Sequence, residues 1–201
     1  MALNFANNNS LSAISVKPSG LSGGSMNLIS TQTASSSSTI SFTSGIDSTY
    51  DEYVFKFINI HASNNSAAFQ VNFSVDSGSN YNATKTTTAF NAQHKEDGSG
   101  GSLGYESSFD LAQSTSPQPI ILGIGNLADE NGNATMSIFS PSSTTFVKHF
   151  ISIAQANYSS EWSFNSYVAG YINSTSAVDA VQFSMSAGTI DSGVIKLYGI
   201  S

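Results

Sequence analysis

Apolar and polar residues alternate along much of the chain, most clearly between residues 69 and 76. There Phe69, Val71, Phe73 and Val75 occupy every second position, and polar residues stand between them. Successive side chains of a β-strand point to opposite faces, so this spacing predicts a strand with one face buried and the other in water. The Ser, Gly, Asn and Asp residues at 76–80 are typical of a turn that ends it.

A second pattern, between residues 53 and 60, predicts a strand in the middle of a sheet. Every position there is apolar except Lys56 and Asn59, which is typical of a strand covered on both faces. No stretch predicts an amphipathic helix, and where residues 147–156 also fit a helical period, the dominance of Phe, Val and Ile favours a strand. Further strands are expected at 38–43, 103–111, 118–124, 134–139, 145–154, 162–172, 178–185 and 193–199.

Short strands separated by Ser, Gly and Asn turns predict an all-β fold. We expect an antiparallel β-sandwich, jelly-roll-like, in a single domain over residues 26–201. Residues 1–25 have a different composition, in which isolated apolar residues stand between Asn, Ser and Gly. Such a segment cannot bury enough surface to fold alone, so an extended N-terminal arm is expected there.

The composition narrows the functions that the chain can have. Of its 201 residues 40 are serine, none is arginine, and only 9% are charged, with a formal net charge of −7. Without Arg there is no bidentate fork for phosphate, and an acidic protein repels nucleic acid and anionic membrane surfaces, so neither is expected as a partner. No cysteine is present, which excludes disulfides and thiolate metal sites.

The sequence shows no targeting or membrane signal. The N-terminal residues carry no basic region followed by an apolar run, and no stretch has the length of a membrane span. We therefore expect a soluble protein that does not follow a general secretion route.

Several motifs match catalytic or cofactor-binding patterns, but their context argues against each. Residues 20–24 fit the nucleophile elbow G-x-S-x-G without the strand and helix that the elbow requires. Residues 123–128 fit a relaxed dinucleotide fingerprint, yet turn residues follow in place of a helix. Asp129, Asn131 and Asn133 alternate like the start of a calcium loop but lack its glycine and its bidentate Glu; calcium held by several segments stays an open alternative.

The remaining candidates for chemistry are scattered. The three histidines His61, His94 and His149 have no metal-ligand spacing. A glycosidase pair would have to come from a few carboxylates that nothing in the sequence brings together: Asp51, Glu52, Asp110, Glu161 and Asp179. We therefore expect no catalytic residue, no cofactor and no metal ligand. The single Trp162 shares a strand face with Phe164, and a core position is favoured over a sugar-stacking platform.

Longer runs carry a family resemblance. They are residues 28–34, 40–50, the strand at 53–61, and then 139–145, 168–171 and 188–200. In this order, and over nearly the whole chain, they resemble small structural proteins of marine tailed bacteriophages, including cyanophages. The resemblance implies a virion component, assembled in the host cytoplasm, and supplies no catalytic residue.

Two hypotheses follow for the function. In the first, the chain is a non-enzymatic decoration or knob-like protein on the exterior of the phage head, a homo-oligomer, expected as a trimer, that contacts other virion proteins such as the major capsid protein. Its attachment residues would be four apolar residues of the arm: Leu3, Phe5, Leu11 and Ile14. In the alternative, it is a tail-fibre or adhesin module that binds host surface glycans through exposed Tyr, Trp or Asn. A secreted lectin or hydrolase is disfavoured by the missing secretion signal and carboxylate pair.

Overall fold

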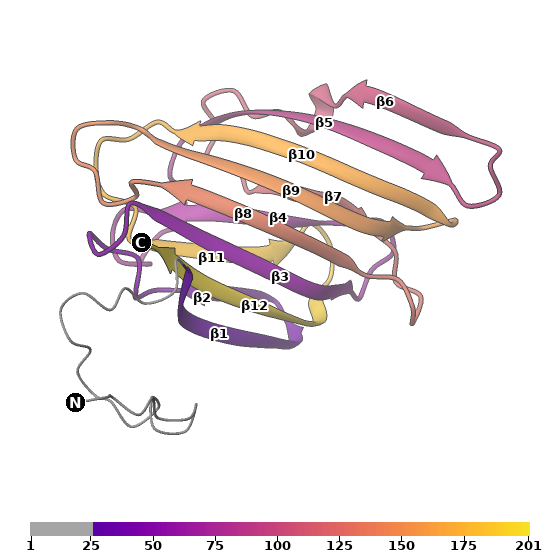
Figure 1. The fold of residues 1–201 in the computed structure, drawn as a ribbon, viewed down its shortest axis with the longest axis horizontal. Coiled ribbons are helices and arrows are strands. Elements are labelled where there is room, and N and C mark those ends of the chain that lie inside the picture. Colours follow the sequence, from indigo (N-terminus) through magenta and orange to yellow (C-terminus); the bar gives the residue numbers. More distant parts are fainter. Residues whose placement is uncertain (1–25) are drawn as a thin grey trace, which may run out of the picture.

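The protein is built from two antiparallel β-sheets that pack face to face (Figure 1). The computed structural model describes residues 26–201, so the candidate attachment residues Leu3, Phe5, Leu11 and Ile14 lie outside the described residues. The first sheet contains, in spatial order, β1 (Met26–Ser37), β12 (Ile190–Ile200), β3 (Glu52–Ala62), β8 (Gly132–Phe139), β9 (Lys148–Tyr158), β10 (Trp162–Ile172), β5 (Lys85–Lys95) and β6 (Gly101–Tyr105). The second contains β2 (Thr39–Phe42), β11 (Ala180–Met185), β4 (Ala67–Ser74) and β7 (Gln118–Ile124).

Eight of the strands follow the order of a jelly roll, which confirms the predicted fold class. β1 pairs with β12, β2 with β11, β3 with β8 and β4 with β7. The first of these eight strands thus pairs with the last and the second with the second-last, as in one long hairpin rolled into two sheets. Among the described residues the only helical element is the 3-10 turn η1 (Ser107–Phe109), and none of their helices is long and apolar enough to cross a membrane.

Two hairpins are inserted into this jelly roll. The hairpin β5–β6 lies between β4 and β7 in the chain, and β9–β10 lies between β8 and β11. They join through β10 and β5, whose register runs without a bulge from Trp162 opposite Lys95 to Ile172 opposite Lys85. The insertion widens one sheet only, so β6 stands at the edge opposite β1 (Figure 1).

Phenylalanine rings fill the space between the two sheets. Phe183 of β11 lies with its ring centroid 5.0 Å from that of Phe57 and 5.1 Å from that of Phe55, both on β3. It also stacks on Phe69 of β4 at 5.6 Å, and all four side chains are at most 1% exposed. Edge-to-face and stacked contacts of this kind stabilise a sandwich beyond the burial of apolar area.

The two clearest predicted strands are present, but their surroundings differ from the prediction. β3 lies inside a sheet as expected, between β12 and β8. Its outer face carries no second layer among the described residues, and Ile58 is 39% exposed. β4 was expected to have one face in water and is instead buried on both, because Asn72 donates a hydrogen bond to the carbonyl oxygen of Thr115 in a loop that covers it.

The sequence pattern did not predict two of the strands, and it predicted a third that is longer than the observed one. β1 and β5 were not expected, although β5 is eleven residues long and lies between two other strands. The strand expected at 103–111 ends at Tyr105 and gives way to the 3-10 turn. The strand interpretation of residues 147–156 is confirmed by β9.

Two lysines lie buried near the ends of the sandwich without a carboxylate beside them. Lys85 Nζ donates to Asn72 Oδ1 at 2.6 Å and to the carbonyl oxygen of Ala83 at 3.0 Å. Lys148 Nζ donates to the carbonyl oxygens of Ser174 and Ser176. Because burial penalises the charged form, it lowers the pKa of Lys85 to about 8 and also lowers the pKa of Lys148.

Replacing the central ring should destabilise the fold strongly. Phe183→Ala removes a fully buried ring that contacts both sheets, so we expect the free energy of unfolding to fall by about 3 to 5 kcal/mol. Urea denaturation followed by circular dichroism measures it. The control is Phe146→Ala, at a side chain that is 72% exposed, where a change within about 0.5 kcal/mol is expected. Equal effects of the two substitutions would contradict the assigned core.

The buried lysine predicts a pH-dependent stability. The unfolded chain keeps the Lys85 proton up to the ordinary pKa of 10.5, while the folded protein releases it near 8. Between these values the unfolded state holds more protons, so the free energy of unfolding should rise with pH. Lys85→Met should reduce this rise in urea denaturation series, and Lys196→Met, on the outer face of β12, should leave it unchanged. An unaltered rise in Lys85→Met would show that Lys85 is not the source.

Candidate functional site

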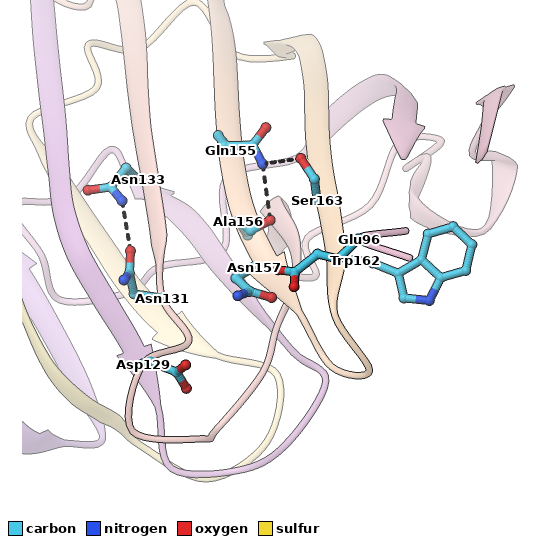
Figure 2. Close-up of a pocket in the computed structure, with 9 residues that line it drawn as sticks. All are labelled: Glu96, Asp129, Asn131, Asn133, Gln155, Ala156, Asn157, Trp162 and Ser163. Atoms are coloured by element: carbon cyan, nitrogen blue, oxygen red, sulfur yellow. Dashed lines mark hydrogen bonds between the residues drawn. The ribbon is translucent and has the colours of Figure 1, made fainter. Parts of the chain in front are cut away.

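A polar cleft of about 360 Å³ opens at one end of the eight-stranded sheet, near the turn between β9 and β10 (Figure 2). Four amide side chains dominate its lining, together with two carboxylates, a hydroxyl and the single tryptophan. The lining residues are Glu96, Asp129, Asn131, Asn133, Gln155, Ala156, Asn157, Trp162 and Ser163.

The alternation of β9 places two of these amides on the outer face of the sheet. Ala154 and Ala156 point into the sandwich and are each 1% exposed, so Gln155 and Asn157 point outward. The register sets Asn133 of β8 opposite Gln155 and Ser163 of β10 opposite Asn157. Polar side chains of three adjacent strands therefore converge on one surface.

Hydrogen bonds fix the orientation of the amides. Gln155 Nε2 donates to Ser163 Oγ at 3.0 Å and to the carbonyl oxygen of Ala156 at 3.2 Å. Asn133 Nδ2 donates to Asn131 Oδ1 at 2.8 Å, and Asn133 Oδ1 accepts from the backbone N–H of Asn59 at 2.9 Å. Figure 2 shows the Asn131–Asn133 pair on one side of the cleft and the Gln155–Ser163 pair on the other.

Asn157 has an acceptor that the protein does not satisfy. Its backbone N–H donates to the carbonyl oxygen of Asn131 at 3.0 Å, and its own carbonyl oxygen accepts from the N–H of Gly125 at 3.1 Å. The side-chain Oδ1 is buried and has no hydrogen-bond partner among the described residues. A buried acceptor left in this way costs about 1 to 3 kcal/mol.

Two carboxylates reach the cleft from separate loops. Asp129 comes from the loop between β7 and β8, and Glu96 from the loop between β5 and β6. The Glu96 loop is held against the β9–β10 turn, because the backbone N–H of Glu96 donates to the carbonyl oxygen of Glu161 at 2.9 Å. Amides both donate and accept, and carboxylates accept, so the cleft is suited chemically to a ligand rich in hydroxyl groups.

Trp162 is neither a core residue nor a platform over the amides. It is half-buried at the start of β10, whereas Phe164, two positions on, belongs to the core at 8% exposure. A Cβ at Gly100 would lie 2.8 Å from Trp162 Cη2, so the loop backbone lies directly against the indole. Figure 2 shows the ring directed away from Gln155 and Asn157. The expected core position was wrong because the sheet extends past the end of the sandwich core here.

A second hollow of about 450 Å³ adjoins the cleft and shares Asp129 and Asn131 with it. His61 Nδ1 lies 3.4 Å from Asp191 Oδ2, and its Nε2 lies 3.1 Å from the carbonyl oxygen of Leu127. Within residues 26–201 no three His, Asp or Glu side chains are grouped as a metal site would require. In the motif that resembles a calcium loop, Asn131 Oδ1 accepts from Asn133 Nδ2 and Asn133 Oδ1 accepts from the N–H of Asn59; calcium held by several segments stays an untested alternative.

Three of the candidate carboxylates are held by hydrogen bonds in different parts of the fold. Glu52 accepts from Ser137 Oγ, Asp110 from the N–H of Ala89, and Asp179 from the N–H of Ser77. Residues 123–128 end β7 and enter a loop with no helix, so the dinucleotide fingerprint lacks its context. The elbow match at residues 20–24 lies outside the described part of the chain.

Sequence reasoning missed most of the cleft. Glu96, Gln155, Asn157 and Ser163 were not singled out. The signal for two of them was present, because Gln155 and Asn157 alternate with alanines in a predicted strand and must share its polar face. Their meeting with Glu96 depends on the pairing of the two inserted hairpins, which a strand pattern does not encode.

Comparisons with known proteins add no family to this description, because no protein-family model, no curated protein sequence and no solved structure matches the chain.

Proposed function

We propose that the chain is a non-enzymatic structural protein of a tailed-phage virion, carried on the exterior of the head as a decoration or knob-like protein. The observation that carries the proposal is the jelly-roll pairing of β1 with β12, β2 with β11, β3 with β8 and β4 with β7. Two-sheet jelly rolls are a common architecture of viral capsid domains. This argument is an analogy of fold, and the resemblance of the sequence to phage structural proteins points the same way.

The surface chemistry fits an exposed coat component. Eleven of the thirteen acidic residues lie in loops, because only Glu52 and Asp191 belong to strands. The loops therefore carry most of the net charge of −7, which favours solubility of a protein displayed in many copies. The side chains that converge in the polar cleft are mainly amides, which serve as neither nucleophiles nor acid–base groups.

The copy number in the particle tests this proposal. Quantitative mass spectrometry of purified virions should find the chain in the hundreds per particle, in a fixed ratio to the major capsid protein. About a dozen copies, the number expected at a tail or portal vertex, would contradict the head location, and absence from virions would contradict the proposal altogether.

A truncated chain tests whether residues 1–25 attach the protein to the virion. Deleting residues 2–24 should abolish incorporation into particles while the β-sandwich still folds, as monitored by circular dichroism. Normal occupancy of the truncated chain would reject Leu3, Phe5, Leu11 and Ile14 as anchors.

The polar cleft favours a second candidate function, recognition of a host-surface glycan. Convergent amides and two carboxylates match the hydroxyl groups of a sugar. In this candidate function the sugar contacts the amides and not Trp162, because the indole is directed away from them (Figure 2).

Substitution of one amide separates binding from folding. Asn157→Ala removes an amide that lines the cleft, so retention on host polysaccharide should weaken. The urea midpoint should stay unchanged or rise, because the buried Oδ1 has no partner among the described residues. The control is Asn173→Ala, in the loop after the opposite end of β10, where retention should persist. Equal retention of both variants, or no retention of the wild type, would exclude this cleft as the glycan site. Detectable cleavage of the glycan would contradict the non-enzymatic proposal.

A further inference from the structure

The outer face of the eight-stranded sheet carries a contiguous group of exposed apolar side chains, called the apolar patch below. It consists of Phe90 on β5 and Ile151 and Ile153 on β9, together with the half-buried Tyr167 on β10. Ile151 and Ile153 are each 48% exposed and Phe90 is 45% exposed. In the register of the sheet Tyr167 lies directly between Ile153 and Phe90.

The apolar patch is ordered by contacts between its own members. The rings of Phe90 and Tyr167 stack across β5 and β10 with centroids 4.7 Å apart and planes 3° from parallel. A shallow hollow of about 120 Å³ between these rings and Ile151 could receive a side chain from a facing surface. Single exposed apolar residues are ordinary, but a contiguous group with a polar border is typical of a protein–protein contact.

The strands that carry most of the apolar patch present almost no charge to solvent. β5, β8, β9 and β10 contain no Asp or Glu. Their lysines, Lys85, Lys95 and Lys148, lie at the alternate positions that point away from the outer face. Two copies of this acidic chain can therefore bring these faces together while their carboxylates remain in the loops, which avoids the like-charge repulsion that would oppose self-association elsewhere.

The face is also large enough for a stable contact. The strands β5, β9 and β10 have eleven residues each and extend about 36 Å, whereas β8 has eight residues and extends about 26 Å. With strands about 4.8 Å apart, the whole face covers about 640 Å², against about 800 Å² on each partner in a typical specific interface.

We propose that a second copy of this chain covers the apolar patch, and that the protein self-associates through the outer face of β5, β8, β9 and β10. The proposal deepens the proposed function by naming the surface that joins the copies, but it rests on the sheet and not on the virion assignment. Packing of the same face from each copy gives a twofold dimer, whereas a threefold ring would pair the patch with another surface. In both arrangements the patch is buried by the same chain.

The oligomeric state of the full chain tests the proposal. Light scattering coupled to size exclusion and sedimentation velocity should report a multiple of the 21.0 kDa chain mass. The double variant Ile151→Lys with Ile153→Lys places two charges at the centre of the patch and should shift the mass to that of a monomer. Both side chains point to solvent, so circular dichroism and the urea midpoint should show a folded protein, and the milder Ile153→Thr should weaken association in part.

A matched control and three outcomes decide the question. Phe146→Lys changes an apolar side chain that is 72% exposed but lies in the loop between β8 and β9, and it should leave the mass unchanged. A monomeric wild type at every concentration, or an oligomer unaffected by the double variant, would overturn the proposal. So would an oligomer that dissociates only when residues 2–24 are deleted, because the N-terminal segment would then be the contact. The oligomeric state of the purified chain does not depend on its copy number in virions, so each of the two proposals can be contradicted without the other.

Discussion

The packing of phenylalanine rings between β3 on one sheet and β4 and β11 on the other is the contact on which this structure depends. The chain has no cysteine, and among the described residues the only lysine–carboxylate ion pair joins Lys95 to the exposed Asp97. Surface pairs of this kind contribute little. The two sheets are therefore held together by apolar burial, and the strands that carry these rings cannot be rearranged without loss of the core.

This constraint determines where polar groups can converge. Apolar side chains fill the interior of the sandwich around these rings. The buried Lys85 and Lys148 lie near strand ends, where they donate hydrogen bonds to backbone or amide oxygens. The outer face of the eight-stranded sheet does not pack against the other sheet, so its side chains need not be apolar. It carries amides at one end and apolar side chains in the middle. The polar cleft and the apolar patch are thus adjacent parts of one surface, and a second copy that spans the full length of β9 and β10 would also cover the amides of the cleft.

Strand content and fold class could be predicted because alternation and turn residues are local signals. β1 and β5 were not predicted because their sequences are rich in Ser and Thr. They form strands because they pair with β12 and β10, which are distant in the chain. The buried polar face of β4 depends on a loop that returns over Asn72. The candidate site was predicted least well, since Glu96 and Asn157 meet only through the register of two hairpins. The trimer, the virion location and the attachment residues of the arm remain predictions.

The insertion of both hairpins into a jelly roll that is complete without them has an evolutionary consequence. The eight jelly-roll strands pair among themselves, and β5–β6 and β9–β10 add to one edge of β8. Most of the polar cleft and of the apolar patch belongs to these hairpins or to their turns. Mutations on the outer face of these hairpins can accumulate with little effect on the scaffold, whereas their inner face carries core residues such as Phe150 and Val168. Such separation lets substitutions on the outer surface change a ligand or partner while the architecture persists.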